Sequence, residues 1–142
     1  MNSPDFLART EFVIDLARRL HAYGTTAQRL EGAITQVART LQLRCEIWSN
    51  PTGIIISFGG GLGPEGGPEN TRVLRLEPGD IDLSKLCAAD AIAERVLSGE
   101  LDVASGRVAL RALDTTPSRL VQWLTALSFG LASAAVAALL RT

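Results

Sequence analysis

The chain has 142 residues, with 14 Lys and Arg against 15 Asp and Glu and a net charge of −1. Proteins that bind mainly nucleic acid usually carry a basic face, so this balance argues against a nucleic-acid partner. Two cysteines and one histidine are too few for a structural zinc site, and they also argue against a secreted disulfide scaffold.

The chain begins with two helical patterns. Apolar residues recur at helical spacing over residues 5–23, and Gly24 follows, which predicts a helix that ends there. A second apolar stripe over residues 30–41 follows Thr25 and Gln28, which have the spacing of a capping box. Because the connection is short, we expect the two helices to form a helical hairpin.

Three strand patterns follow the helical hairpin. Residues 43–47 alternate between apolar and polar, residues 54–58 are rich in β-branched side chains, and residues 72–77 form a third short run. A glycine-rich stretch over residues 59–68 separates the last two and is expected to be a loop. Consecutive strands with short connections favour an antiparallel meander.

Helical spacing returns in the second half of the chain. Asp82 is a good N-cap for a helix over residues 83–97, and Asp102 is a good N-cap for a shorter helix that ends near residue 113. With an apolar helix after these, the order is ααβββααα. The predicted fold class is therefore α+β, with a helical hairpin, a three-stranded, mainly antiparallel sheet and two further helices before the last one.

The C-terminal segment is the most apolar part of the chain. Residues 120–140 carry no charge, and 16 of these 21 residues are hydrophobic. A helix of this length spans about 32 Å, against about 30 Å for the hydrocarbon core of a bilayer. We therefore predict a cytoplasmic α+β module at residues 1–118 and a first transmembrane helix at residues 119–142. The alternative is a helix buried in the core of a soluble domain.

The flanks of this segment suggest an orientation and a packing face. Arg107, Arg111 and Arg119 precede the helix and only Arg141 follows it, so the positive-inside rule places the body in the cytoplasm. One flank of the helix has small side chains, which would let another membrane helix approach closely. The residues of this flank are Ala126, Gly130, Ser133 and Ala137.

Few residues point to chemistry. Residues 61–66 match the spacing GxGxxG after a strand, but Pro64 and a following strand deny the helix that a dinucleotide site needs, so we interpret them as a hairpin loop. His21 lies near the end of the first helix and is expected at the surface or beside the cap, without a nucleophile nearby. Cys45 and Cys87 lie on apolar faces, where burial is the default. We predict no catalytic residue, no metal site and no cofactor.

Five residue runs carry a family resemblance. They are residues 24–31, 50–58, 72–75, 83–86 and 99–113, which continue into the apolar helix. The runs are distributed over nearly the whole chain, and the sequence resembles the N-terminal region of the bacterial threonine/serine exporter family.

The resemblance implies a membrane function. That family consists of secondary transporters that export small amino acids, or dicarboxylates in related split systems, and it has a cytoplasmic N-terminal module ahead of several membrane helices. One helix cannot enclose a substrate path, so this chain would transport only within a larger assembly of the bacterial cytoplasmic (inner) membrane. The implied partners are the remaining membrane helices or a partner membrane subunit, and a homo-oligomer stays open. The alternative is a free-standing cytoplasmic ligand-binding or interaction domain.

The matched positions include three characteristic polar residues, Arg29, Glu31 and Arg75. A guanidinium group binds a carboxylate through two parallel hydrogen bonds, so these residues are candidates for substrate binding. The alternative is an internal ion pair, between Arg29 and Glu31 or between Glu31 and Arg75, that joins the second helix to the sheet.

Overall fold

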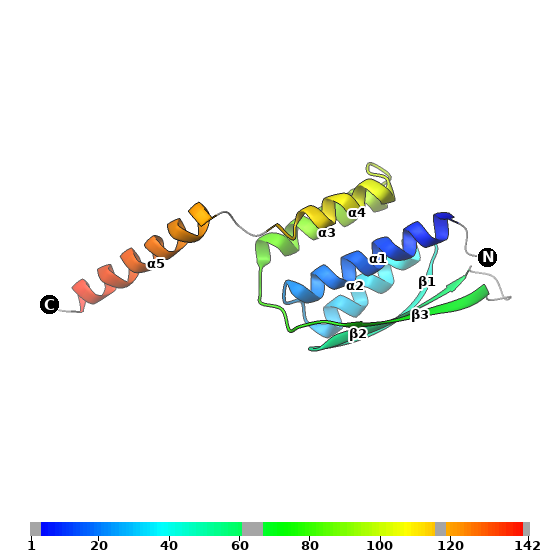
Figure 1. Cartoon of the computed structure of the whole chain (residues 1–142), viewed down its shortest axis with the longest axis horizontal. Coiled ribbons are helices and arrows are strands. Elements are labelled where there is room, and N and C mark those ends of the chain that lie inside the picture. The colour runs from blue at the N-terminus through cyan, green and yellow to red at the C-terminus, as the bar shows by residue number, and fades with distance from the viewer. Residues whose placement is uncertain (1–3, 61–66, 116–118, 141–142) are drawn as a thin grey trace.

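The computed structural model describes residues 4–60, 67–115 and 119–140 and has the predicted α+β order (Figure 1). The elements in chain order are α1 (Pro4–Ala22), α2 (Ala27–Thr40), β1 (Arg44–Asn50), β2 (Gly53–Gly60), β3 (Gly67–Arg75), α3 (Leu83–Leu97), α4 (Val103–Ala112) and α5 (Arg119–Leu139). The two N-terminal helices form the expected hairpin, and the three strands form the expected antiparallel meander.

The sheet has the order β1-β2-β3 and buries one face. Ile54, Ile56 and Phe58 of the central strand point into the core and are at most 1% exposed. On the other face Trp48, Ile55 and Val73 lie in register across the three strands and are exposed. Alternation along the strands therefore matches the predicted period of two.

The strands extend beyond their predicted bounds. β1 continues to Asn50, and β3 begins at Gly67, inside the stretch that was expected to be a loop. Residues 67–71 of β3 are Gly, Pro, Glu, Asn and Thr, which do not alternate between apolar and polar, so a period-two pattern does not reveal them as part of a strand. Residues 61–66, which carry the GxGxxG spacing, lie outside the described residues.

Helix α1 is the central element of the body. Figure 1 shows α1 and α2 over one face of the sheet, with α3 and α4 as a further layer on α1. Phe12, Val13 and Ala17 of α1 are completely buried. Because other elements cover α1 on several sides, its polar residues Arg19 and His21 are also buried, at 6% exposed each.

Two aspartates cap α3 and α4 as predicted. The carboxylate of Asp82 accepts a hydrogen bond from the backbone amide of Lys85 at 3.0 Å, and that of Asp102 accepts one from the amide of Ser105 at 3.2 Å. Hydrogen bonds from the side chain and the backbone amide of Ser105 hold the pKa of Asp102 below its ordinary value.

Neither cysteine is fully buried. Cys45 is half-buried on β1, and burial raises the pKa of its thiol to about 12. The expectation that Cys87 is buried is wrong, because the buried side of α3 consists of Ala89, Ala93 and Val96 and leaves Cys87 exposed.

Helix α5 does not pack on any other described element. Its large side chains, such as Leu120, Trp123 and Phe129, are about 70% exposed. The alternative in which the C-terminal helix is buried in the core of a soluble domain is therefore wrong.

Within the described residues, no helix has both the length and the apolarity that a membrane crossing requires. The transmembrane helix predicted at residues 119–142 is therefore unsupported.

Candidate functional site

The turn between α1 and α2 brings the end of one helix against the start of the next. Gly24 has φ = +80°, and a Cβ atom at this position would lie 2.9 Å from Cα of Ile81. The amide of Thr25 donates to the carbonyl of Leu20 at 3.0 Å and completes the last turn of α1. The turn separates two clefts.

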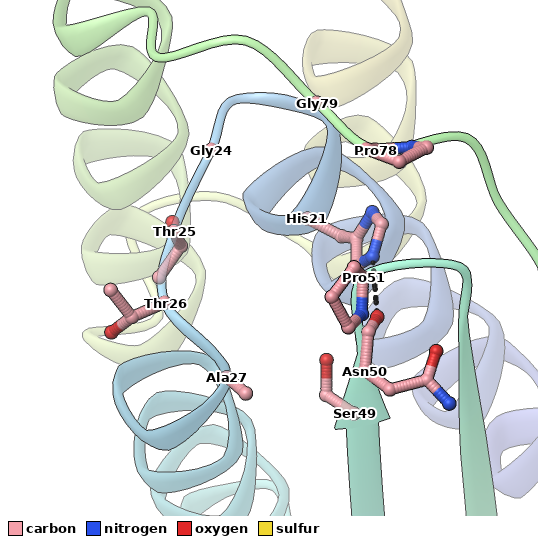
Figure 2. Close-up of a pocket in the computed structure, with 10 residues that line it drawn as sticks. All are labelled: His21, Gly24, Thr25, Thr26, Ala27, Ser49, Asn50, Pro51, Pro78 and Gly79. Carbon is pink, nitrogen blue, oxygen red and sulfur yellow. Dashed lines mark hydrogen bonds between the residues drawn. The ribbon is translucent and has the colours of Figure 1, made fainter.

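The first, which we call the His21 cleft, has a volume of about 220 Å³. Figure 2 shows His21 and the turn after β1 on one side, with the start of α2 opposite. Its lining residues are His21, Gly24, Thr25, Thr26, Ala27, Ser49, Asn50, Pro51, Pro78 and Gly79. No carboxylate, lysine or arginine is among them.

His21 has one ring nitrogen bound and one free. Its Nε2 lies 2.9 Å from the backbone carbonyl oxygen of Asn50, and because a carbonyl only accepts, Nε2 donates. Nδ1 is buried and has no partner among the described residues. His21 lies in the last turn of α1 as expected, but it is 6% exposed, so the expectation of a surface position is wrong.

The start of α2 is not capped by a side chain. The N-cap is Thr26, with φ = −64° and ψ = 148°, and it makes no side-chain cap bond, so the predicted capping box of Thr25 and Gln28 does not form. The first turn carries no acidic residue, and the amides of residues 27–29 have no hydrogen-bond partner in the described part of the chain. This end of α2 therefore presents free donors and the positive end of the helix dipole.

A second cleft, of about 290 Å³, lies on the other side of the same turn. It shares Gly24, Thr25 and Thr26 with the His21 cleft and adds the only charged lining residues, Arg29 and Asp90.

The three predicted polar residues lie apart. Arg29 lines the second cleft, whereas Arg75 lines a shallow hollow beside Trp48 on the open face of the sheet. Glu31 accepts a hydrogen bond from the backbone amide of Ser49 at 2.7 Å and so joins α2 to β1. No ion pair links any two of the three within the described ranges, so neither predicted ion pair forms.

Sequence reasoning missed the polar residues of the His21 cleft. A usable signal existed at Ser49, which is 8% exposed and continues the inward positions of Cys45 and Ile47 along β1. A polar residue at a buried position of a strand needs a partner or a function.

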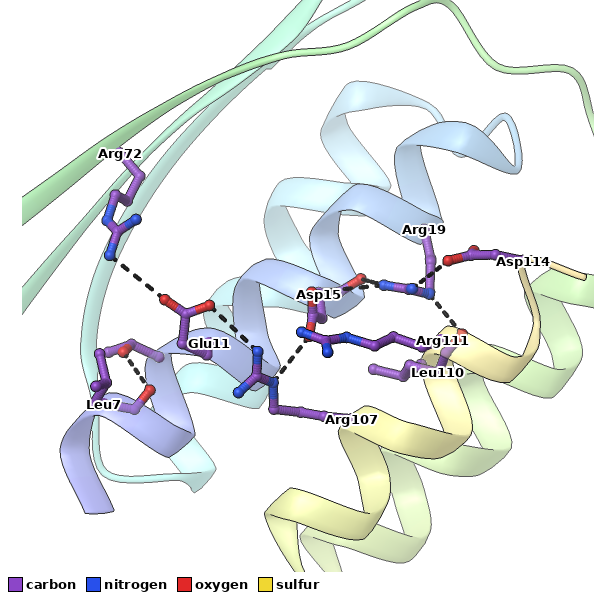
Figure 3. A network of polar contacts seen from close by, with 10 residues as sticks. Leu7, Glu11, Asp15, Arg19, Arg72, Arg107, Leu110, Arg111 and Asp114 are labelled. Atoms are coloured by element: carbon purple, nitrogen blue, oxygen red, sulfur yellow. Dashed lines mark hydrogen bonds and ion pairs between the residues drawn. The ribbon is translucent and has the colours of Figure 1, made fainter. Parts of the chain in front are cut away.

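A network of charged residues joins α1 to α4 (Figure 3). Asp15, whose side chain is 13% exposed, accepts hydrogen bonds from Arg107 Nε at 2.9 Å and Arg111 Nη2 at 3.4 Å. These arginines, which entered the positive-inside count, therefore pair with a carboxylate of the body.

The other end of this network lies just before α5. Arg19 Nη2 lies 2.5 Å from the carboxylate of Asp114, and Arg19 Nε donates to the carbonyl of Leu110 at 2.6 Å. The hydroxyl of Tyr23 donates to Asp114 at 3.3 Å. Burial, followed by the charge of Asp114, raises the pKa of Tyr23.

The predicted packing residues of α5 are uncovered. Ala126 and Gly130 line a shallow hollow with Trp123 and two leucines, and Ser133 and Ala137 are exposed further along. A Cβ atom on Gly130 would meet nothing within 4 Å.

Comparison with known sequences places the chain among membrane proteins. Residues 11–142 match the family described as "Putative threonine/serine exporter". "Pheromone-regulated membrane protein 10" of Candida albicans (strain SC5314) is 29% identical over 132 residues, which are 93% of this chain and 12% of that protein. An uncharacterized protein of Schizosaccharomyces pombe is 26% identical over 93% of the chain and 17% of its own length. The chain thus spans less than a fifth of these relatives, and no solved structure matches it.

Proposed function

The chain belongs to the threonine/serine exporter family, and we propose that it is the regulatory module and adjoining helix of a small-amino-acid exporter. Threonine and serine are the proposed substrates, and a small dicarboxylate is the second choice. Transport requires a larger membrane assembly, in which the body lies on the cytoplasmic side of the bacterial inner membrane.

The uncovered state of α5 is the observation that carries this proposal. The body buries its own core, whereas α5 leaves a row of large apolar side chains exposed. Contiguous exposed apolar surface marks an interaction site. The small flank at Ala126, Gly130, Ser133 and Ala137 would let another helix approach closely. The proposed partners are further helices of the same exporter or a partner membrane subunit.

A regulatory role for the body follows from what one helix can do. Substrate sites of secondary transporters lie between several helices, whereas the two clefts described above lie on the surface of the body. The body therefore acts on the transport path without forming it. Two free cysteines support a reducing, cytoplasmic location.

The route from the body to α5 runs through Asp114. This residue lies five positions before Arg119, where α5 begins, and it contacts both Arg19 and Tyr23. Tyr23 directly precedes Gly24, which lines both clefts. A ligand at the turn between α1 and α2 can thus shift the anchor of the segment that leads to α5.

The test is an export assay in bacteria that carry the chain together with the membrane part with which it assembles. Cells are preloaded with radiolabelled threonine, and its release is followed for the intact protein and for a form without residues 4–115. We expect the deletion to abolish release while the protein remains in the membrane fraction, as checked by immunoblot.

A point variant avoids the ambiguity of a deletion that fails to assemble. Asp114→Ala should change the release rate, whereas Arg95→Ala, which removes an exposed ion pair with Glu100, should not. Release equal to that of cells with an empty vector would exclude export. Unchanged release from both the deletion and the Asp114 variant would exclude regulation by the body.

A further inference from the structure

Two buried side-chain polar atoms lack a hydrogen-bond partner within residues 4–60, 67–115 and 119–140: Nδ1 of His21 and Oγ1 of Thr25. Both residues line the His21 cleft. Leaving a buried polar atom unpaired costs free energy, and most such atoms in folded proteins are paired. Their occurrence in one cleft, beside the uncapped start of α2, indicates that a ligand completes these hydrogen bonds.

We propose that the His21 cleft binds a small amino acid in its zwitterionic form. The start of α2 holds the carboxylate, because the free amides of residues 27–29 and the helix dipole both favour an anion there. Thr25, whose buried hydroxyl has no partner among the described residues, lines the same cleft and is the proposed donor of a further hydrogen bond to the carboxylate. No acidic side chain lines the cleft to repel it.

The histidine supplies the complementary group. Because Nε2 donates to the carbonyl of Asn50, Nδ1 of the neutral ring is an acceptor. It accepts from the ammonium group or from a side-chain hydroxyl of the ligand. In Figure 2 the ring lies between Asn50 and the segment of Pro78 and Gly79, which closes the cleft on that side.

The lining also excludes other ligand classes. It contains no lysine or arginine, so a dianion such as inorganic phosphate or a dicarboxylate would leave a charge uncompensated. A volume of about 220 Å³ is below the range of roughly 300–1,000 Å³ usual for drug-sized ligands. A small amino acid, with a single carboxylate and one ammonium group close to it, satisfies both the charge limit and the volume limit.

The choice of an amino acid as the ligand rests on the proposed export function, whereas the inference that the cleft binds a polar ligand rests on the geometry of the cleft alone.

The test uses the intact chain in a mild detergent that covers α5. His21 is the only histidine of the chain, so ¹⁵N-histidine labelling gives one pair of ring nitrogen resonances. We expect L-threonine to shift the Nδ1 resonance in a saturable way, whereas threoninamide, which lacks the carboxylate, and propionate, which lacks the ammonium group, should not.

Two variants test the donors without emptying the core. Thr25→Val removes a buried hydroxyl that has no partner, so the free protein should be at least as stable as the wild type, while threonine binding weakens at least about tenfold. Ala27→Pro removes one amide at the first helical position, where proline is accepted and where ψ of 148° at Thr26 is compatible with it. Gly32→Ala, which lies on α2 outside the cleft, is the matched control and should bind like the wild type.

Three outcomes overturn the assignment. The first is that threonine causes no shift of the Nδ1 resonance at roughly 50 mM, a concentration far above the usual KM values of enzymes for metabolites. The second is that propionate or phosphate causes a shift equal to that caused by threonine. The third is that both variants bind threonine as the wild type does. The export assay is independent of these results. If export depends on the body but threonine does not bind in the cleft, the proposed function holds and the binding site is excluded. If threonine binds but the protein does not export it, the binding site holds and the proposed function is excluded.

Discussion

At the scale of single residues, the body depends on charges held between α1 and α4. The side chain of Arg19 is 7% exposed and satisfies its guanidinium group with the carboxylate of Asp114 and two backbone carbonyls. Asp15 faces Arg19, Arg107 and Arg111 at once. Charges taken out of water stabilise a fold only when every partner is present, so the loss of one member should be costly.

We therefore expect Asp15→Asn to lower the free energy of unfolding by about 3 kcal/mol, because the variant keeps the shape of the side chain and leaves three arginines without their shared carboxylate. Urea denaturation followed by circular dichroism measures the change. Glu100→Gln is the control, since it breaks an exposed pair with Arg95 and should cost less than about 1 kcal/mol. Equal effects of the two substitutions would contradict the importance of burial.

At the scale of elements, two helical glycines have opposite surroundings. A Cβ atom at Gly32 of α2 would meet nothing within 4 Å, whereas one at Gly106 of α4 would lie 2.5 Å from Cγ2 of Val96 and 3.0 Å from Phe12. The glycine at position 106 allows α4 to approach α1 and α3 closely.

Replacement of each glycine by alanine should therefore change stability with opposite signs. We expect Gly32→Ala to stabilise the protein by roughly 0.5–1 kcal/mol through helix propensity, and Gly106→Ala to destabilise it by roughly 1–3 kcal/mol through overpacking. Both values follow from urea titrations under one set of conditions. A stabilising Gly106→Ala would show that α4 does not pack on α1 as described.

The cap of α4 should make a pH-dependent contribution. Hydrogen bonds to Ser105 lower the pKa of Asp102 in the folded state from its ordinary value of 3.8. The stabilisation is therefore fully present above the unfolded pKa and is lost as pH falls through the folded pKa. Asp102→Ala should lower the thermal midpoint at pH 7, and the difference from wild type should shrink toward pH 2. Asp102→Asn, which still caps a helix, should show less of this pH dependence.

Element types could be predicted where the sequence has a strong period. The helices and the meander follow from apolar spacing, and Asp82 and Asp102 mark the starts of α3 and α4 correctly. The capping box at Thr25 failed because α2 begins one residue later, at an N-cap whose side chain makes no cap bond. The first residues of β3, from Gly67 onward, lack the apolar–polar alternation that would have identified them as part of a strand.

The candidate site was harder to predict than the fold. Arg29 lines a cleft, whereas Glu31 and Arg75 lie elsewhere, because a family pattern does not say which residues meet in space. His21 was expected at the surface or beside the cap, but it is 6% exposed. The burial of α1 by α3 and α4 is a tertiary effect that no local period contains.

At the scale of the whole molecule, the body should not need α5 for its stability. Because α5 packs on no other described element, a chain that ends at residue 115 should have the same free energy of unfolding in urea as the intact chain, within about 0.5 kcal/mol. Sedimentation without detergent should find the shortened chain monomeric and the intact chain associated through its exposed apolar residues. A lower midpoint for the shortened chain would mean that α5 contacts the body.

The distance along the chain between α1 and its charged partners has a consequence for the order of folding. Asp15 and Arg107 are 92 residues apart, whereas α1, α2 and the three strands contact near neighbours in sequence. Contacts of high sequence separation form late, because closing a long loop costs entropy before any contact repays it. During synthesis the hairpin and meander can therefore form first. Asp15 and Arg19 remain without their charged partners until the last residues of the body have been synthesised. Those residues leave the ribosome immediately before α5.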